Sequence, residues 1–250
     1  MTPLEATIVA AVGVFAGGMN AVVGSGTLVT FPVLLAIGYP PVVANISNGL
    51  GLVPGSVSGA VGYRRELTGQ RNRLLRFGAV TAAGAVGGAL LLLALPADTF
   101  EAVVPALILL ALVLVLVQPW LARRLAERTD RHEHGGPVLL LGILCVGVYG
   151  GYFGASQGVM NLALMGIMLD EDLQRLNAAK NVLTAAANLV SGLVFVFVAD
   201  VAWPVVLLLA AGSVVGGQLG AKVGRRLRPG WLRALIVTVG VIAIVQLLMS

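Results

Sequence analysis

Residues 17–38 read GGMNAVVGSGTLVTFPVLLAIG, and this stretch decides the fold. A glycine-rich break, Gly24-Ser25-Gly26, separates a long apolar run from a second apolar segment, residues 27–38. At 1.5 Å per residue a helix of that length spans roughly 18 Å, whereas the hydrocarbon core of a bilayer is roughly 30 Å thick. The segment therefore predicts a half-helix or a strongly broken membrane span. A second break, GASQG at residues 154–158, precedes a second short apolar segment, 158–169.

The composition excludes a water-soluble protein. Of 250 residues, 58% are hydrophobic and 11% are charged, whereas soluble domains carry about 25% charged residues. The net charge of +5 is not arranged as a basic stripe with interleaved aromatic residues, so no nucleic-acid partner is expected. The apolar runs are continuous rather than alternating, which favours helices over barrel strands. We predict an all-α polytopic membrane protein whose surroundings are the lipid bilayer.

Glycine, proline and charged residues divide the chain into ten apolar segments. Eight are long enough to cross as helices, and the two short ones either cross as broken helices or re-enter. No basic residue precedes Arg64, so the first segment is expected to be a mature helix rather than a signal peptide. The predicted segments are 4–23, 27–38, 41–62, 77–95, 102–120, 138–156, 158–169, 174–198, 203–221 and 231–249.

The two halves of the chain resemble each other. A shift of 133 residues aligns Asn48 with Asn181, and a shift of 128 to 129 residues aligns Gly84 with Gly212. Single matches arise easily in a sequence rich in glycine, alanine and valine. The persistence of one offset with a small slip favours an internal duplication.

The basic loops predict the orientation, because loops rich in lysine and arginine stay in the cytoplasm. One basic loop, 63–76, precedes segment 77–95, whereas another, 222–233, follows the matching segment 203–221. The two halves are therefore predicted to be inverted, with both termini outside the cytoplasm. The predicted parts are a first membrane repeat at 1–120, a charged cytoplasmic linker at 121–136 and a second, inverted repeat at 137–250.

The linker holds both histidines of the chain. His132 and His134 flank Glu133 and could weakly bind a metal, but the charged neighbours favour a solvated connector. The single cysteine, Cys145, permits no intrachain disulfide and matches no metal-ligand spacing. No cofactor and no metal are expected.

Each short segment offers a helix N-terminus at its break. The first amides of a helix lack intrahelical partners and carry the positive end of the helix dipole, so they can receive an anion. Thr27 and Gly158 begin the two short segments, and Ser25 and Gln157 precede them. Ser25 and Gln157 could cap these ends or contact a solute directly. The alternative is that the glycines only allow close helix packing.

Polar residues mark two of the long segments. Five of them recur at steps of four and three, which places them on one helical face that should point to the protein interior. Such a stripe either bonds a neighbouring helix or lines a polar path. Asn45 and Asn48 begin a similar face in the first half. The five residues of the stripe are Asn177, Asn181, Thr184, Asn188 and Ser191.

Lys180 is the only cationic residue inside a predicted span. Two roles remain open, a ligand for an anion or an anchor that snorkels to the cytoplasmic interface. The acidic run Asp170, Glu171 and Asp172 precedes the same segment. It is expected to form a solvated turn or to pair with Arg175 or Lys180.

The chain contains no enzyme motif of the HExxH, GxSxG or GxxxxGK[ST] type, so it is not expected to be an enzyme. Inverted halves with interrupted helices at corresponding positions instead indicate a secondary transporter with a site near the midplane. Coupling to protons or to sodium ions, or movement down the solute's own gradient, would supply the energy. The alternatives are a non-transporting membrane subunit, an intramembrane enzyme, or a carrier of a neutral solute or a metal cation.

The chain resembles the TauE/SafE sulfite-exporter family, also called the 4-toluene sulfonate uptake permease family, over nearly its whole length. The motifs in the first half are Gly17-Gly18-Met19-Asn20, Gly24-Ser25-Gly26, Phe31-Pro32-Val33-Leu34-Leu35, Ala44-Asn45 with Asn48, and Gly59 with Tyr63-Arg64-Arg65. Those in the second half are Gly150-Gly151, Phe153-Gly154, and Asn177 with Lys180-Asn181.

This resemblance implies a bacterial plasma-membrane transporter of a small oxyanion, namely sulfite, an organosulfonate or a related sulfur-containing anion. Combined with the inverted halves, it leads us to expect alternating access at a site between the repeats. The polar positions that carry over from the family are Asn45, Asn48, Asn177, Lys180 and Asn181. The full set of expected solute-binding residues is Ser25, Thr27, Asn45, Asn48, Gln157, Asn177, Lys180, Asn181 and Thr184.

Overall fold

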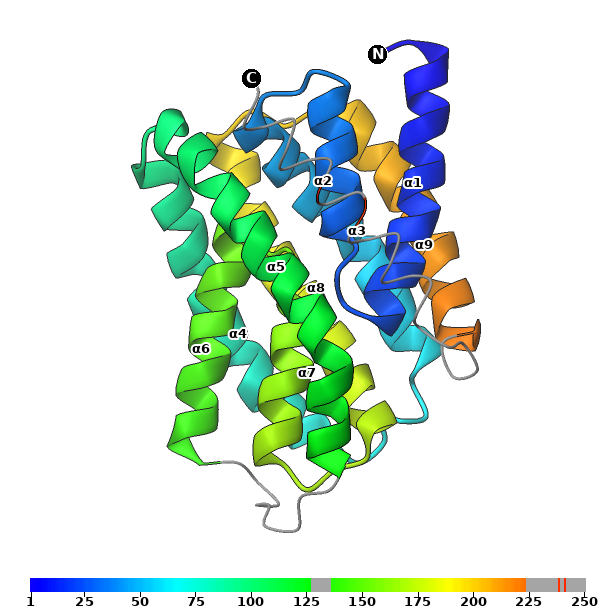
Figure 1. Cartoon of the computed structure of the whole chain (residues 1–250), viewed down its shortest axis with the longest axis vertical. Coiled ribbons are helices and arrows are strands. Elements are labelled where there is room, and N and C mark those ends of the chain that lie inside the picture. Colours follow the sequence, from blue (N-terminus) through cyan, green and yellow to red (C-terminus); the bar gives the residue numbers. More distant parts are fainter. Residues whose placement is uncertain (127–135, 224–237, 239–240, 242–250) are drawn as a thin grey trace.

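The computed structural model of the protein describes residues 1–126 and 136–223, together with Thr238 and Val241. All regular structure in these residues is helical (Figure 1), which confirms the predicted fold class. Five of the helices are long and apolar enough to cross a membrane. The helices are α1 Pro3–Val22, α2 Thr27–Ala36, α3 Pro41–Gly62, α4 Arg71–Ala94, α5 Ala97–Ala126, α6 Pro137–Tyr152, α7 Gln157–Met168, α8 Leu173–Val198 and α9 Trp203–Val223.

The two short segments are short helices, as predicted. Helix α2 has 10 residues and α7 has 12. Two other predicted boundaries are wrong. Helix α4 begins at Arg71 rather than at residue 77, because arginine is a good helix former whose apolar stem tolerates a helix end. Helix α6 ends at Tyr152 with 16 residues, because the chain turns at Gly154, which has a φ of 76°.

Some predictions fall on residues outside the described ranges. They concern segment 231–249, the histidines His132 and His134, and most of the basic loop 222–233.

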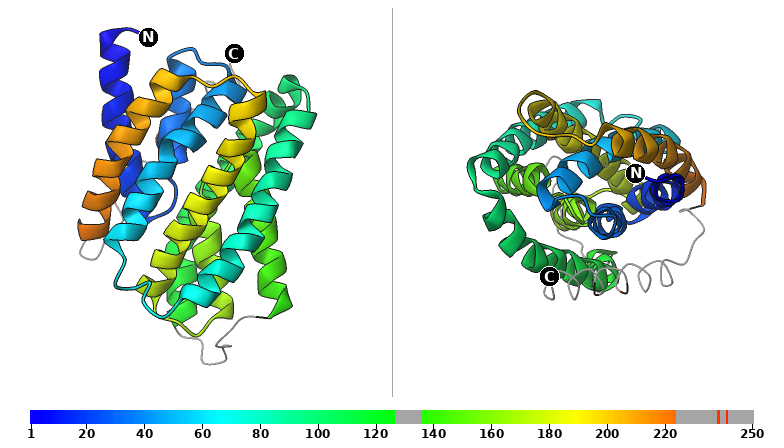
Figure 2. Two further views of the ribbon diagram at one scale, coloured as in Figure 1. Left: turned by 180° about the vertical axis from the view of Figure 1, so that it is seen from behind. Right: turned by 90° about the horizontal axis from the view of Figure 1, so that it is seen from above.

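Four helices form a row through the centre of the protein. Seen from behind, α9, α3, α8 and α4 lie side by side in that order (Figure 2), and each contacts the next. Helix α1 packs on α9 at one end of the row, and α6 packs on α4 at the other. Helices α4 and α9 run in opposite directions, as do α1 and α6 (Figure 1). The short helices α2 and α7 lie in front of this row.

Glycines let the outer helix pairs approach closely. A Cβ atom on Gly88 of α4 would overlap the carbonyl oxygen of Val148 on α6, and a Cβ on Gly216 of α9 would overlap that of Val14 on α1. Shifts of 134 residues for α1 and α6, and of 128 for α4 and α9, relate the two sets of contacts. Two further matching sets are Gly84 with Leu144 and Val148, and Gly212 with Ala10 and Val14.

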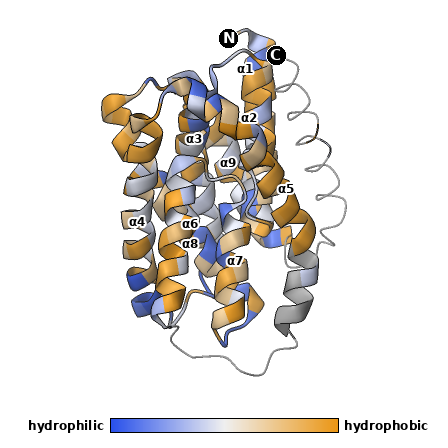
Figure 3. Ribbon diagram, turned by 60° about the vertical axis from the view of Figure 1, so that its left-hand side comes forward, coloured by the Kyte–Doolittle hydropathy of each residue, from blue (hydrophilic) through white to orange (hydrophobic). Residues whose placement is uncertain are grey.

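Large apolar side chains cover the outside of the bundle. Phe197 is 82% exposed, Leu207 67% and Leu116 57%. Hydrophobic residues cover most of the outer helices, and hydrophilic residues gather at places such as the start of α4 (Figure 3). In water such a surface would be unfavourable, whereas lipid tails solvate it.

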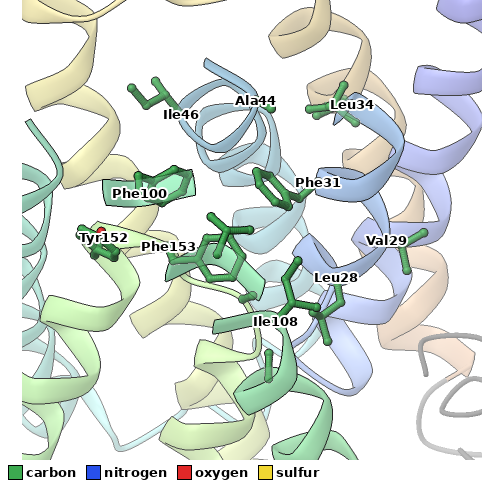
Figure 4. Packing of buried hydrophobic residues seen from close by; sticks show 14 of the residues in the cluster. Leu28, Val29, Phe31, Leu34, Ala44, Ile46, Phe100, Ile108, Tyr152 and Phe153 are labelled. Carbon is green, nitrogen blue, oxygen red and sulfur yellow. The ribbon is translucent and has the colours of Figure 1, made fainter. Parts of the chain in front are cut away.

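An aromatic cluster joins the two halves of the chain near the breaks. The ring of Phe31 in α2 meets Phe153, which follows α6, edge to face at a centroid distance of 5.3 Å (Figure 4). Phe100 of α5 contacts Tyr152 and Phe153 at 5.6 and 6.1 Å. These apolar contacts hold the two interrupted regions together.

The glycine contacts predict a difference between two neighbouring substitutions. Gly88→Ala should destabilise the protein by about 1–3 kcal/mol, because its methyl group meets backbone atoms of α6 that cannot yield. Gly87→Ala should be neutral or stabilising, because its Cβ would have only Val148 Cγ2 nearby, at 3.9 Å, and alanine favours helix. Thermal unfolding in detergent compares the two variants. Equal melting temperatures would contradict the packing described here.

Candidate functional site

The two interrupted regions meet inside the protein. After α1 the chain turns at Gly24, with a φ of 88°, and α2 begins at Thr27. After α6 it turns at Gly154 and passes through Ser156, with a φ of 58°, before α7 begins. A Cβ on Gly24 would lie 2.7 Å from the Cα of Gly158, so the two backbones touch. We call this contact of Gly24 with Gly158 the junction. From it α2 and α7 run in opposite directions (Figure 1).

Both helix starts at the junction hold unpaired polar groups. Among the described residues, no acceptor lies within hydrogen-bond range of the amides of Thr27 and Gly158. Neither helix has a side-chain cap. The Ser25 hydroxyl and the Gln157 amide group are buried without a partner in the described part of the chain. Ser25 and Gln157 therefore do not cap these ends, and α7 begins at Gln157, one residue earlier than predicted.

The asparagines of α3 hold the backbone around the junction. Asn48 donates to the Thr27 hydroxyl at 3.2 Å and accepts from the Thr30 hydroxyl. Asn45 donates to the main-chain oxygen of Tyr152 at 2.9 Å. Asn45 thus satisfies a carbonyl at the end of α6, in the other half of the chain.

The polar residues of α8 hold the end of α1 in the same way. The ammonium group of Lys180 donates to the main-chain oxygens of Asn20 at 3.0 Å and Ala21 at 3.2 Å. Asn177 and Asn181 also donate to Ala21, at 3.2 and 3.4 Å. The last carbonyls of a helix carry the negative end of its dipole, so a cation there is favourable.

Lys180 does not reach the interface. Its side chain is fully buried, so the structure does not support the role of a snorkelling anchor. An ammonium group has three N–H donors, and two of them bond to α1. One donor therefore remains for a solute.

A small cavity lies on one side of the junction, between α3 and α8. Its polar lining comes from both halves of the chain and includes Thr27 and Asn45. Every residue of the α8 stripe is buried, so the stripe faces the protein interior as its spacing predicts. The lining residues are Thr27, Asn45, Ile46, Gly49, Leu50, Gly150, Gly151, Phe153, Asn188, Ser191, Gly192 and Phe195.

The predicted site residues fall into three groups. Thr27 and Asn45 line the cavity, and Gln157 lies against Gly150 of its lining. Asn48, Asn177, Lys180 and Asn181 bond to α1 or α2. Ser25 and Thr184 have buried hydroxyls with no partner in the described residues.

Sequence reasoning missed two residues of this region. Asn20 accepts from the amide of Gly26 at 3.4 Å and donates to Ser56 at 3.1 Å. Asn161 is fully buried, and its amide group has no partner in the described part of the chain. A signal for Asn161 existed, because it is a polar residue in an apolar segment, one turn after Gln157.

An ion-pair network ties the α3–α4 connection to the turn before α8. Glu171 accepts from Arg73 at 2.8 Å and from Arg175 at 2.7 Å. Partial burial raises the pKa of Glu171, but the hydrogen bonds from the two arginines outweigh burial and leave the pKa below its usual value. Asp172 caps α8 by accepting from the amide of Gln174 at 2.8 Å. The predicted pairing with Arg175 is confirmed for Glu171.

Comparison with known proteins identifies the family. The family model described as "Sulfite exporter TauE/SafE" matches residues 9–247. The chain belongs to this family. A protein named probable membrane transporter protein YfcA from Escherichia coli K12 is 27% identical over 249 residues, which is 99% of this chain and 91% of the relative. A probable membrane transporter protein of Haemophilus influenzae is 30% identical over 215 residues, 84% of this chain and 82% of the relative. No solved structure matches the chain.

Membership of the TauE/SafE family decides the general function. The protein is an integral membrane transporter that moves a small solute across a lipid bilayer, and it is not an enzyme. The junction and the cavity lie between parts contributed by both halves of this TauE/SafE protein, which makes them the candidate site of transport.

The ion-pair network predicts a pH-dependent contribution to stability. Because the folded pKa of Glu171 is lowered, its contribution is complete above the unfolded pKa of about 4.3 and is lost as the pH falls through the folded value. Glu171→Gln should lower the free energy of unfolding by up to about 1 kcal/mol at neutral pH and by less in acid. Thermal unfolding of this variant and of the exposed control Glu101→Gln between pH 3 and 7 tests this. A pH-independent difference would count against the network.

Proposed function

We propose that the protein is a secondary transporter of a small oxyanion, sulfite, an organosulfonate or a related sulfur-containing anion. The observation that carries this proposal is the junction, where two helix N-termini meet with unpaired amides. Helix N-termini favour negative charge and donate hydrogen bonds to anions. Lys180 adds a basic group beside them, since its Cδ lies 3.1 Å from where a Cβ on Gly158 would stand.

The surrounding charge favours an anion over a cation. Among the described residues, Lys180 is the only lysine, arginine, aspartate or glutamate that is buried. A metal cation would require anionic or imidazole ligands in the interior. Of the predicted residues, Ser25, Thr27, Gln157 and the third donor of Lys180 are proposed to contact the solute. Asn45, Asn48, Asn177, Asn181 and Thr184 are proposed to line or position the site.

We propose further that the two halves are inverted repeats, 1–120 and 137–250, joined by the cytoplasmic linker 121–136. The matching glycine contacts of α4 with α6 and of α9 with α1 support a duplication. The opposite directions of α4 and α9 (Figure 1) support the inversion. Inverted repeats allow alternating access, because one half can rock against the other around a central site.

The proposed location is the bacterial plasma membrane, with both termini outside the cytoplasm. The start of α4, which carries Arg71, Arg73 and Arg76, then faces the cytoplasm, as basic ends do. The Glu171 network lies at the same side of the protein and closes it in this state. Protons or sodium ions are the proposed coupling ions if transport is active, and otherwise the solute moves down its own gradient.

Flux measurements test the proposed function directly. Purified protein in liposomes should take up or release labelled sulfite or a simple sulfonate such as methanesulfonate faster than protein-free liposomes. Alanine or choline should not compete, because neither is an anion at neutral pH. Absence of flux for every anion of such a panel would reject the proposal.

Substitution of Lys180 tests whether it serves the solute as well as α1. Lys180→Met should weaken anion binding about tenfold or more, because a hydrogen bond to a charged group is lost. Asn177→Leu is the matched control, since it removes a donor to the same Ala21 oxygen without removing a basic group. Titration calorimetry of both variants gives the affinities. Equal affinities would assign Lys180 to the end of α1 alone.

A further inference from the structure

Two fully buried amide side chains on α7 have no hydrogen-bond partner among the described residues. All four side-chain nitrogen and oxygen atoms of Gln157 and Asn161 are unpaired there, and both residues have 0% exposure. A buried donor or acceptor without a partner is costly. A fold keeps four such atoms together where a further molecule fills them.

The two amides lie on one face of α7. Residues four apart share a helix face, so Asn161 stands one turn below Gln157. Gln157 lies against Gly150 of α6. Helix α7 runs from the junction towards the turn that carries Glu171 (Figure 1). Asn161 is therefore on the opposite side of the junction from the cavity, which lies between the first half of α3 and the second half of α8.

The first half of the chain lacks this vacancy. In α2 the hydroxyls of Thr27 and Thr30 bond to Asn48 of α3. The counterpart of Asn48 is Asn181, which instead donates to the main-chain oxygens of Ala21 and Asn177. No side chain of α8 in the described residues thus satisfies the polar face of α7, because the residues that would do so hold the end of α1.

The neighbours of this face specify the charge of the missing molecule. Gly158, next to Gln157, packs against the stem of Lys180. Helices α7 and α8 form an antiparallel pair, so Asn161 lies level with Asn177, whose side-chain oxygen is also unpaired. No aspartate or glutamate is among the buried residues of the described chain. Amide N–H donors beside a basic group, without a carboxylate, suit an oxyanion.

We propose that Gln157 and Asn161 form a second station for the transported oxyanion, on the Glu171 side of the junction. This inference rests on the proposed function and adds a second binding position to it. The anion enters the cavity at Thr27 and Asn45, passes Lys180 and the junction as the halves move, and then bonds to the amides of α7. Opening of the Glu171 network releases it.

Substitution of Asn161 separates this station from the cavity. Asn161→Leu removes the polar atoms at similar volume, and it should melt at or above the wild-type temperature because no existing bond is lost. Flux of labelled sulfite or methanesulfonate in liposomes should fall about tenfold, the loss of one hydrogen bond to a charged group. Asn161→Asp should abolish flux, because a carboxylate repels the anion. Anion affinity at the cavity should stay within about twofold of wild type.

The controls distinguish the possible failures. Met160→Leu, on the neighbouring position of α7, should leave flux unchanged. If Asn161→Leu does not fold, Asn161→Ser provides the same comparison. Wild-type flux that persists unchanged in the leucine, serine or aspartate variant overturns the second station and leaves the proposed function intact. Absence of anion flux in the wild type rejects the proposed function and the station together.

Discussion

The backbone contact between Gly24 and Gly158 is the constraint on which the rest of the structure depends. Each glycine would need its neighbour to move if it carried a Cβ, since the added atom would lie within 2.7 Å of the other residue's Cα. The contact is possible because both chains are interrupted at the same depth. Two helix N-termini consequently meet inside the protein, and their first amides point at no acceptor in the described residues. A membrane interior without water makes such a polar centre costly unless a solute uses it.

The carbonyls exposed by the same interruptions are satisfied across the halves. Lys180, Asn177 and Asn181 bond to the end of α1, and Asn45 bonds to the end of α6. Each half therefore completes the hydrogen bonding of the other half's broken helix. Relative movement of the halves must strain or exchange these bonds, which couples the site to the conformation of the whole transporter.

Much of this arrangement is predictable from the sequence, because glycine breaks and segment length are local signals. The length of 27–38 alone predicts α2, and the spacing from Asn177 to Ser191 predicts its burial. The partners of Lys180 are not predictable in the same way, because a main-chain carbonyl leaves no mark in the sequence. The start of α4 at Arg71 was missed because charged residues mark a loop and a helix end equally well. Asn161 was missed because a single polar residue forms no pattern.

A structure with a bound heavy analogue tests the central claim most directly. Selenite resembles sulfite in shape and charge, and its selenium atom scatters strongly. The account predicts selenium density beside the junction, with its oxygens within hydrogen-bond distance of the amides of Thr27 and Gly158. Density confined to the surface of the protein, with the junction amides empty at saturating selenite, would contradict it.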